Sequence, residues 1–173
     1  MAQPDTPSRL VETPTAYFLT FSCYGTRLHG DARGTVDRFA NAPGTTVLAT
    51  SGRRECFEQY LLKHRPIALN ACQRGLVLSA IRRHCEVREW RLYAAHVRTN
   101  HVHVVLWVDV QPEDAMAQLK RYASRALNQS VGKNGRWWAR HGSTRYLWNE
   151  RQIAEAVSYV AHEQGAPMAL YLN

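Results

Sequence analysis

The pattern of apolar and polar residues along the chain predicts strands and helices in alternation. The aromatic, β-prone segment Tyr17–Tyr24 is typical of a strand. After Asn70, which can act as an N-cap, apolar residues recur with helical spacing, and we expect this helix to end near Glu89. The segment Trp90–Val97 predicts a second strand, and Arg98–Asn100 is short enough for a tight hairpin to a third.

The third strand, Asn100–Trp107, is apolar and β-branched, as a buried strand should be. Side chains alternate along a strand, so His101 and His103 share one face, with Cβ atoms roughly 7 Å apart, while Val102 and Val104 face the other way. Two neutral imidazoles at that spacing can hold one divalent metal ion. A strand histidine can equally be a hydrogen-bonded core residue, and the pattern alone leaves both readings open.

The second half of the chain predicts two more helices and one short strand. Pro112, followed by two acids, marks a helix start, and Ser130–Arg136 reads as a loop with two glycines. A short strand is expected near Arg145–Trp148. Asn149 can cap a last helix over Glu150–Gln164, which a glycine and a proline then stop.

The order β, α, β, β, α, β, α indicates an α+β fold: a ferredoxin-like antiparallel sheet (βαββαβ) with an additional C-terminal helix. In that topology the histidine strand lies inside the sheet. We expect a single domain over residues 1–173, with a loose arm at 1–14 and a loop-rich excursion at 25–66 that includes one short helix near Arg54–Lys63.

Composition narrows the class of protein. Apolar residues make up 45% and charged residues 21% of the 173 residues, which is ordinary for one soluble globular domain. The four cysteines form no CxxC pair, which argues against a zinc knuckle or a disulfide framework and fits a reducing compartment. The N-terminal residues lack the features of a signal peptide, and no apolar run approaches ~18 residues, so we expect no membrane span.

Positive charge is concentrated in one part of the chain. The net charge is +8, and the segment Ala117–Arg151 holds eight basic residues against one acid, Glu150. A solvated basic face would explain this, but a polyanion such as nucleic acid is the more natural partner. The candidate DNA contacts in this segment are Lys120, Arg121, Arg125, Arg136, Arg140, Arg145 and Trp138.

One tyrosine on the last helix stands apart from the apolar stripe. At about 100° per residue, Ile153, Val160 and Gln164 cluster on one side, whereas Tyr159 lies off that side. Glu163 follows Tyr159 by one turn and can reach the same small site. The pKa of a free tyrosine is about 10, so a nucleophilic tyrosine needs a metal ion and basic neighbours to help activate it. Tyr122 and Tyr146 are rival candidates.

Three stretches together resemble a known family. They are Tyr24–Asp31, Arg98–His103 and Trp138–Trp148, and they occur in the order, and with the later tyrosine helix, seen in single-tyrosine HUH transposases. The chain looks closest to REP-associated tyrosine transposases and related bacterial, insertion-sequence transposase-like proteins, so we expect a DNA transposase or a domesticated relative of one. The resemblance runs from about Tyr17 to Pro167.

The resemblance implies a mechanism and a setting. His101 and His103 would hold Mg²⁺ or Mn²⁺, and the metal would polarise a scissile phosphate in single-stranded, hairpin-containing DNA. Tyr159 would attack and leave a 5′-phosphotyrosine and a free 3′-OH, and the strand would then be rejoined elsewhere. Such proteins act in the bacterial cytoplasm, on the nucleoid. Because Mg²⁺ prefers oxygen ligands, two histidines also suit Mn²⁺ or Zn²⁺.

The third metal ligand departs from the family pattern. The family places a polar side chain, often glutamine or asparagine, one turn after the tyrosine, and here that position is Glu163. Gln164 is one residue further and would face the core on an ideal helix. We therefore expect Glu163 to be the third ligand, and Gln164 remains the alternative if the helix frays or shifts at its end. The sequence leaves open whether the active unit is a monomer or a homodimer.

Two other functions fit the same residues. A non-enzymatic binder of single-stranded nucleic acid could stack bases on the aromatic side chains Tyr17, Tyr93, Trp137, Trp138 and Trp148. A metal-dependent phosphoesterase could use His101 and His103 with water as the nucleophile, and His29 and Asp31 could line its site. Only the transposase predicts a covalent protein–DNA adduct.

Overall fold

The computed structural model of the chain describes residues 13–26, 60, 62, 64–132 and 136–173. The predicted N-terminal arm and most of the predicted excursion, including the helix near Arg54–Lys63, lie outside the described residues. So do His29 and Asp31.

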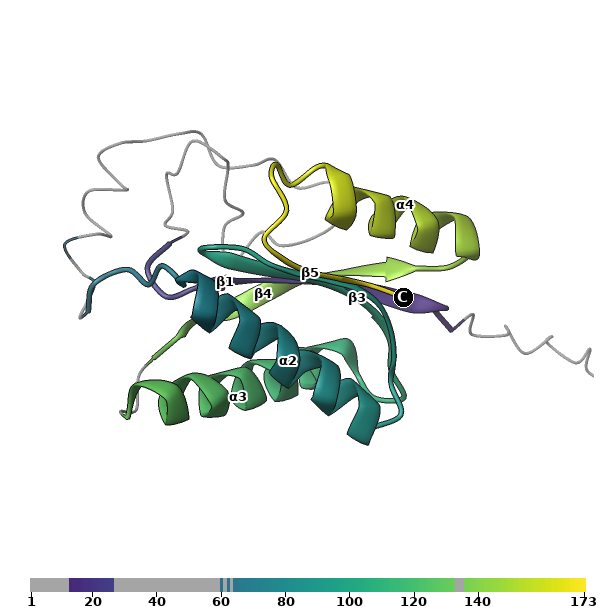
Figure 1. Ribbon diagram of the computed structural model, residues 1–173. Coiled ribbons are helices and arrows are strands. Elements are labelled where there is room, and N and C mark those ends of the chain that lie inside the picture. Colours follow the sequence, from purple (N-terminus) through teal and green to yellow (C-terminus); the bar gives the residue numbers. More distant parts are fainter. Residues whose placement is uncertain (1–12, 27–59, 61, 63, 133–135) are drawn as a thin grey trace, which may run out of the picture.

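The described residues form a five-stranded antiparallel sheet with strand order β4-β1-β3-β2-β5 (Figure 1). The strands are β1 Ala16–Cys23, β2 Arg91–Val97, β3 His101–Trp107, β4 Trp138–Leu147 and β5 Ala169–Leu172. The first four strands have the ferredoxin-like order, and the histidine strand β3 is central, as the sequence predicts.

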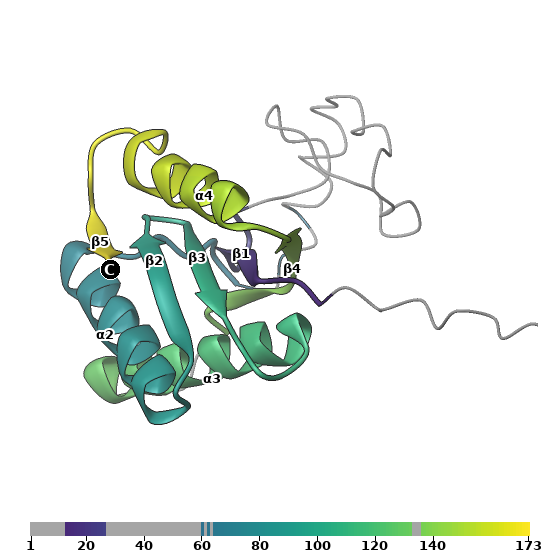
Figure 2. The same ribbon diagram turned by 90° about the vertical axis from the view of Figure 1, so that its right-hand side faces the viewer.

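The helices cover the sheet unequally. α2, Ala71–Val87, and α3, Pro112–Val131, lie on one face, whereas α4, Glu150–His162, lies alone on the other (Figures 1 and 2). Asn70 starts α2 through a capping box with Gln73, and the proline at the first position of α3 fits the helix start expected there. The three helices therefore begin where the sequence predicts, and α4 defines the face that carries the site.

Alternation along the strands builds one core on each face. Leu19 and Phe21 of β1 point into a large core beneath the sheet that includes Leu119 of α3. Val105 of β3 belongs to a smaller core under α4, which also contains Val160. Since residues two apart share a face, His103 lies on the same side as Val105 and therefore under α4.

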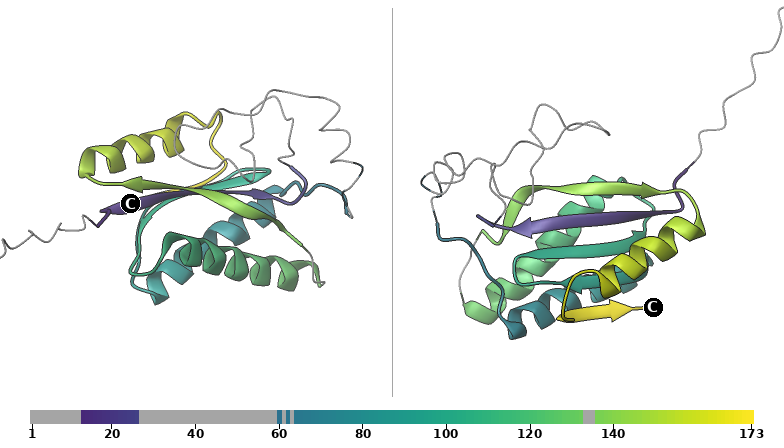
Figure 3. Two further views of the ribbon diagram at one scale, coloured as in Figure 1. Left: turned by 180° about the vertical axis from the view of Figure 1, so that it is seen from behind. Right: turned by 90° about the horizontal axis from the view of Figure 1, so that it is seen from above.

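Three features differ from the sequence prediction. β4 is ten residues long rather than short, β5 was not predicted, and α4 ends at His162 rather than near Gln164. β4 is exposed along most of its length, so burial imposes little apolar alternation on its sequence. Beyond α4 the chain turns at Gly165, whose φ of 73° suits glycine, before β5 pairs with the edge of β2 (Figure 3).

Among the residues that the structure describes, no helix is both long and apolar enough to cross a membrane.

Candidate active site

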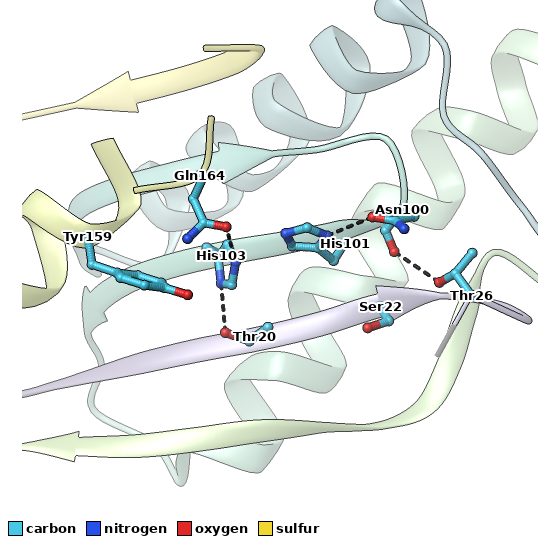
Figure 4. Close-up of a pocket in the computed structure, with 8 residues that line it drawn as sticks. All are labelled: Thr20, Ser22, Thr26, Asn100, His101, His103, Tyr159 and Gln164. Carbon is cyan, nitrogen blue, oxygen red and sulfur yellow. Dashed lines mark hydrogen bonds between the residues drawn. The ribbon is translucent and has the colours of Figure 1, made fainter. Parts of the chain in front are cut away.

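A pocket of about 200 Å³ opens on the α4 face of the sheet (Figure 4). Residues from β1, β3 and α4, from the turn between β2 and β3, and from the segments that follow β1 and α4 line it. They are Thr20, Ser22, Thr26, Asn100, His101, His103, Tyr159 and Gln164. The structure thus brings the two predicted metal histidines and the predicted nucleophile to one site.

His103 is held by partners at both ring nitrogens. It is buried, its Nδ1 lies 2.8 Å from the Thr20 hydroxyl, and its Nε2 lies 3.1 Å from Gln164 Oε1. Thr20 is the cross-strand neighbour of His103, so the register of β1 and β3 fixes this contact. A hydroxyl can donate or accept a hydrogen bond, and Thr20 therefore suits either neutral tautomer of the ring. Because an amide oxygen can only accept, the contact with Gln164 Oε1 requires Nε2–H, and Nδ1 then accepts the Thr20 hydroxyl; a metal ion at Nε2 would take the place of this proton, with Nδ1–H donating to Thr20 instead.

His101 lies beside His103, with ring centroids 4.8 Å apart. Its Nδ1 donates to Asn100 Oδ1 at 2.7 Å, which directs Nε2 away from Asn100. The Asn100 carbonyl accepts hydrogen bonds from the Cys23 amide at 2.8 Å and the Thr26 hydroxyl at 3.1 Å. The end of β1 therefore fixes Asn100, and Asn100 in turn orients the ring of His101.

Tyr159 extends from α4 into the pocket, with its hydroxyl directed toward the space beside His103 (Figure 4). Its ring packs edge-on against His103 and Phe18, with both centroid distances 5.9 Å. The side chain is 37% exposed, so solvent or a ligand can reach it. The rival tyrosines do not line this pocket: Tyr122 stacks on His84 on the opposite face, and Tyr146 packs against Tyr17.

The structure places Glu163, the candidate third ligand, differently from the sequence expectation. α4 ends at His162, and Glu163 is its C-cap, with an amide that donates to the Tyr159 carbonyl at 3.1 Å. The Glu163 side chain is exposed and does not line the pocket. Gln164 lies beyond the helix, so ideal helical geometry does not apply to it, and its side chain turns onto His103. Of the two candidates, Gln164 and not Glu163 therefore contacts the histidine pair.

The donor set of this pocket fits a divalent metal ion. Within the described part of the chain, no three His, Cys, Asp or Glu residues gather as a metal cluster. The pocket instead offers two imidazoles and the amide oxygen of Gln164. Imidazole suits Mn²⁺ and Zn²⁺, and an amide oxygen suits the harder Mg²⁺ and Mn²⁺.

Two of the predicted DNA contacts have structural roles. The Lys120 ammonium donates to the carbonyls of Ala139 and His141, at 3.0 and 3.1 Å, and burial lowers the pKa of Lys120 to about 8. Trp138 is buried, and its indole N–H lies 3.0 Å from both the Lys120 carbonyl and the Ser124 hydroxyl. Trp138 is therefore too buried to stack on a base, and the Lys120 ammonium is held by backbone carbonyls of β4.

The predicted arginine contacts lie on different sides of the sheet. Arg121 and Arg125 are exposed on α3, away from the pocket, and Arg125 lies over the Tyr122 ring. Arg145 is the cross-strand neighbour of Phe18 and so shares the face of Tyr159. Arg136 lies over the Tyr24 ring at 5.0 Å, near the end of β1. The basic segment is therefore not one continuous surface.

A second hollow, of about 800 Å³, lies between α3 and β4. Its basic lining residues are Lys120, Arg140, His141 and Arg145, and Glu113 is the acid among its lining residues. The edge strand β4 therefore carries basic side chains beside this hollow and, at Arg145, on the α4 face of the sheet.

Comparison with known proteins identifies the family of this chain. The family model for IS200-like transposases matches residues 45–164, a range that includes both histidines, Tyr159 and Gln164. No curated protein matches the chain. One similar solved structure is a REP-associated tyrosine transposase bound to a REP hairpin; it is 13% identical, with a TM-score of 0.47, over 92% of this chain and 70% of that chain. Because the family model covers more than half of the sequence, the chain belongs to the IS200-like transposase family.

Proposed function

We propose that this transposase cleaves and rejoins single-stranded, hairpin-containing DNA through a 5′-phosphotyrosine intermediate. The observation that carries the proposal is the shared pocket, in which the Tyr159 hydroxyl points toward a pair of oriented histidines (Figure 4). Metal-assisted phosphoryl transfer needs a hydroxyl nucleophile beside side chains that can hold a metal ion.

Tyr159 is the proposed nucleophile. Its oxygen forms a bond to the scissile phosphorus while the bond from phosphorus to the 3′ oxygen breaks. The phenol loses its proton, and the departing 3′ oxygen gains one, so a free 3′-OH remains. The reverse step, with another 3′-OH as the nucleophile, releases Tyr159 and rejoins the strand.

His101, His103 and Gln164 are the proposed ligands of Mg²⁺ or Mn²⁺. A bound divalent ion would supply positive charge to the phosphate oxygens. The protein's own contribution is orientation: Asn100 directs the ring of His101 and Thr20 directs that of His103. Gln164, rather than Glu163, is the proposed third ligand, because its amide oxygen lies 3.1 Å from His103 Nε2.

DNA is proposed to run along the edge strand β4. Arg145 shares the face of Tyr159, and Arg140 lines the neighbouring hollow between α3 and β4. Arg136 stands near the opposite end of the pocket, where Thr26 lies. Arg121 and Arg125 project from the other face and could contact only a part of the DNA that wraps around the domain.

The test is covalent capture of DNA. Incubation of the full chain with a hairpin-containing single strand and Mn²⁺ should give an adduct that survives a denaturing gel. Tyr159→Phe removes one oxygen and should abolish the adduct while DNA binding persists. Tyr122→Phe, a matched change on the opposite face of the sheet, should form the adduct normally.

Other outcomes would assign a different function. Cleavage without an adduct would indicate a phosphoesterase that uses water, and binding without cleavage would indicate a non-enzymatic binder. An adduct that persists in Tyr159→Phe and is lost in Tyr146→Phe would overturn the assignment of the nucleophile.

A further inference from the structure

The position of Gln164 is set outside α4, because the helix ends at His162. A side chain beyond a helix end gains no orientation from helical hydrogen bonds. Some other contact must therefore hold the segment Val160–Met168 for Gln164 to meet His103. The strand β2 supplies such contacts.

His96 of β2 joins both ends of this segment. Its Nδ1 lies 2.9 Å from the Val160 carbonyl, in the last turn of α4, and its Nε2 accepts the Met168 amide at 3.1 Å. Because the Met168 N–H must donate, Nε2 carries no hydrogen, and Nδ1–H donates to Val160. A neutral ring in one tautomer thus connects the helix end to the chain that returns toward β5.

The ring of His96 is also fixed relative to the histidines of the pocket. His96 is fully buried, and it is the cross-strand neighbour of His103. The end of β2 adds a second contact with the loop, since Arg98 Nη1 donates to the Ala166 carbonyl. The loop that carries Gln164 is therefore attached to β2, next to the strand that carries His103.

We propose that His96 is a positioning residue that connects Val160 to Met168 and so places Gln164 against His103. This inference rests on the proposed function, in which Gln164 and the two histidines share a metal ion. His96 does not line the pocket. It acts through the segment that it holds, and its removal should free Gln164 while leaving His101 and His103 in place.

The variants separate the two hydrogen bonds. Asparagine at position 96 can reach the Nδ1 position and keep the contact with Val160, and glutamine can reach the Nε2 position and keep that with Met168. Arg98→Ala removes the surface contact and leaves the buried core intact. The matched control is His84→Asn, because His84 is also buried and hydrogen-bonded, to Gln118, but on the opposite face.

The readout is Mn²⁺ affinity of the full chain without DNA, titrated with Mn²⁺ alone. His96→Asn and His96→Gln should each weaken binding by about tenfold, the lower range for residues that orient metal ligands, and Arg98→Ala should weaken it less. His84→Asn should lower stability without changing the affinity. In a Gln164→Ala background, His96→Asn should have no further effect, because the residue through which it acts is gone.

The inference and the proposed function can fail separately. Wild-type affinity in folded His96→Asn and Arg98→Ala, with a loss in His103→Ala and Gln164→Ala, would overturn the inference alone. An additive effect of His96→Asn in the Gln164→Ala background would do the same, since a general loss of stability would act regardless of Gln164. Unchanged affinity in His103→Ala would overturn the proposed metal site and the inference together.

Discussion

At the scale of single residues, the hydroxyl of Thr20 orients the ring of His103 through its contact with Nδ1. Thr20→Val keeps the shape of the side chain and removes the hydrogen bond to Nδ1. We expect Mn²⁺ affinity to fall by roughly 10- to 100-fold, because residues that orient metal ligands have effects of this size. Isothermal titration with Mn²⁺ measures this directly.

Thr15→Val is the matched control for that change. Thr15 also lies near β1 and donates to the Trp148 carbonyl at 3.0 Å, but it does not line the pocket. Its loss should leave Mn²⁺ affinity at the wild-type value. Equal affinities in the two variants would show that Thr20 does not orient a ligand.

The sequence predicts the position of a side chain correctly where local backbone geometry determines it. It fails where contacts between segments distant in sequence determine that position. The period of a strand is enough to place His101 and His103 on one face, and the structure places them so. The choice between Glu163 and Gln164 depended on where α4 ends. That end depends on Gly165 and on contacts with β2, which are distant in sequence and give no periodic signal.

At the scale of elements, Lys120 connects α3 to an irregular part of β4. The pairing of β1 with β4 shifts between Phe21 and Cys23, and Lys120 donates to carbonyls of the extra residues there. Lys120→Met should destabilise the fold by about 1–3 kcal/mol, the cost of leaving partly buried carbonyls without a donor. Urea unfolding measures this loss.

DNA binding distinguishes this structural role from an electrostatic one. Lysine and arginine side chains on phosphates displace condensed counterions, so removing one flattens the dependence of affinity on salt. Arg145→Ala should flatten this dependence for a hairpin-containing strand, whereas Lys120→Met should preserve it. If Lys120→Met flattens the dependence of DNA affinity on salt while it keeps wild-type stability, Lys120 contacts DNA.

The elements missed by sequence reasoning are those with weak burial patterns. β4 is exposed along most of its length, and its sequence shows little alternation. β5 has four residues and pairs with the edge of β2, a contact that its own short sequence does not reveal. The helices α2 and α3 and the strands β1 to β3, in contrast, bury a continuous core, and their sequences carry the matching periods.

At the scale of the whole molecule, burial of histidine in the core between α2 and α3 couples stability to pH. His84 is buried, its Nε2 lies 3.1 Å from Gln118 Oε1, and its ring stacks on Tyr122. Burial lowers the pKa of His84 below its ordinary value of 6.5; the hydrogen bond to Gln118 offsets part of this shift, and the positive charges of Arg88 and Arg121 lower the pKa further. The folded protein therefore favours the neutral ring.

This lowered pKa makes the folded protein less stable as the pH falls. As the pH falls through 6.5, the unfolded chain binds a proton at position 84 before the folded protein does, so the free energy of unfolding falls. His84→Gln removes this proton uptake and keeps a polar group for Gln118. Below pH 6.5 its stability should therefore depend less steeply on pH, by at most about 1.4 kcal/mol per pH unit, the limit for one proton.

Urea unfolding at several values of pH between 5 and 8 tests this coupling. Some dependence should remain in His84→Gln, because burial also lowers the pKa of His96 on the other face. His141→Gln is the control, since the His141 side chain is exposed on β4, and it should keep the wild-type dependence. If His84→Gln and His141→Gln give the same curve as the wild type, the packing of α2 on α3 does not favour a neutral His84.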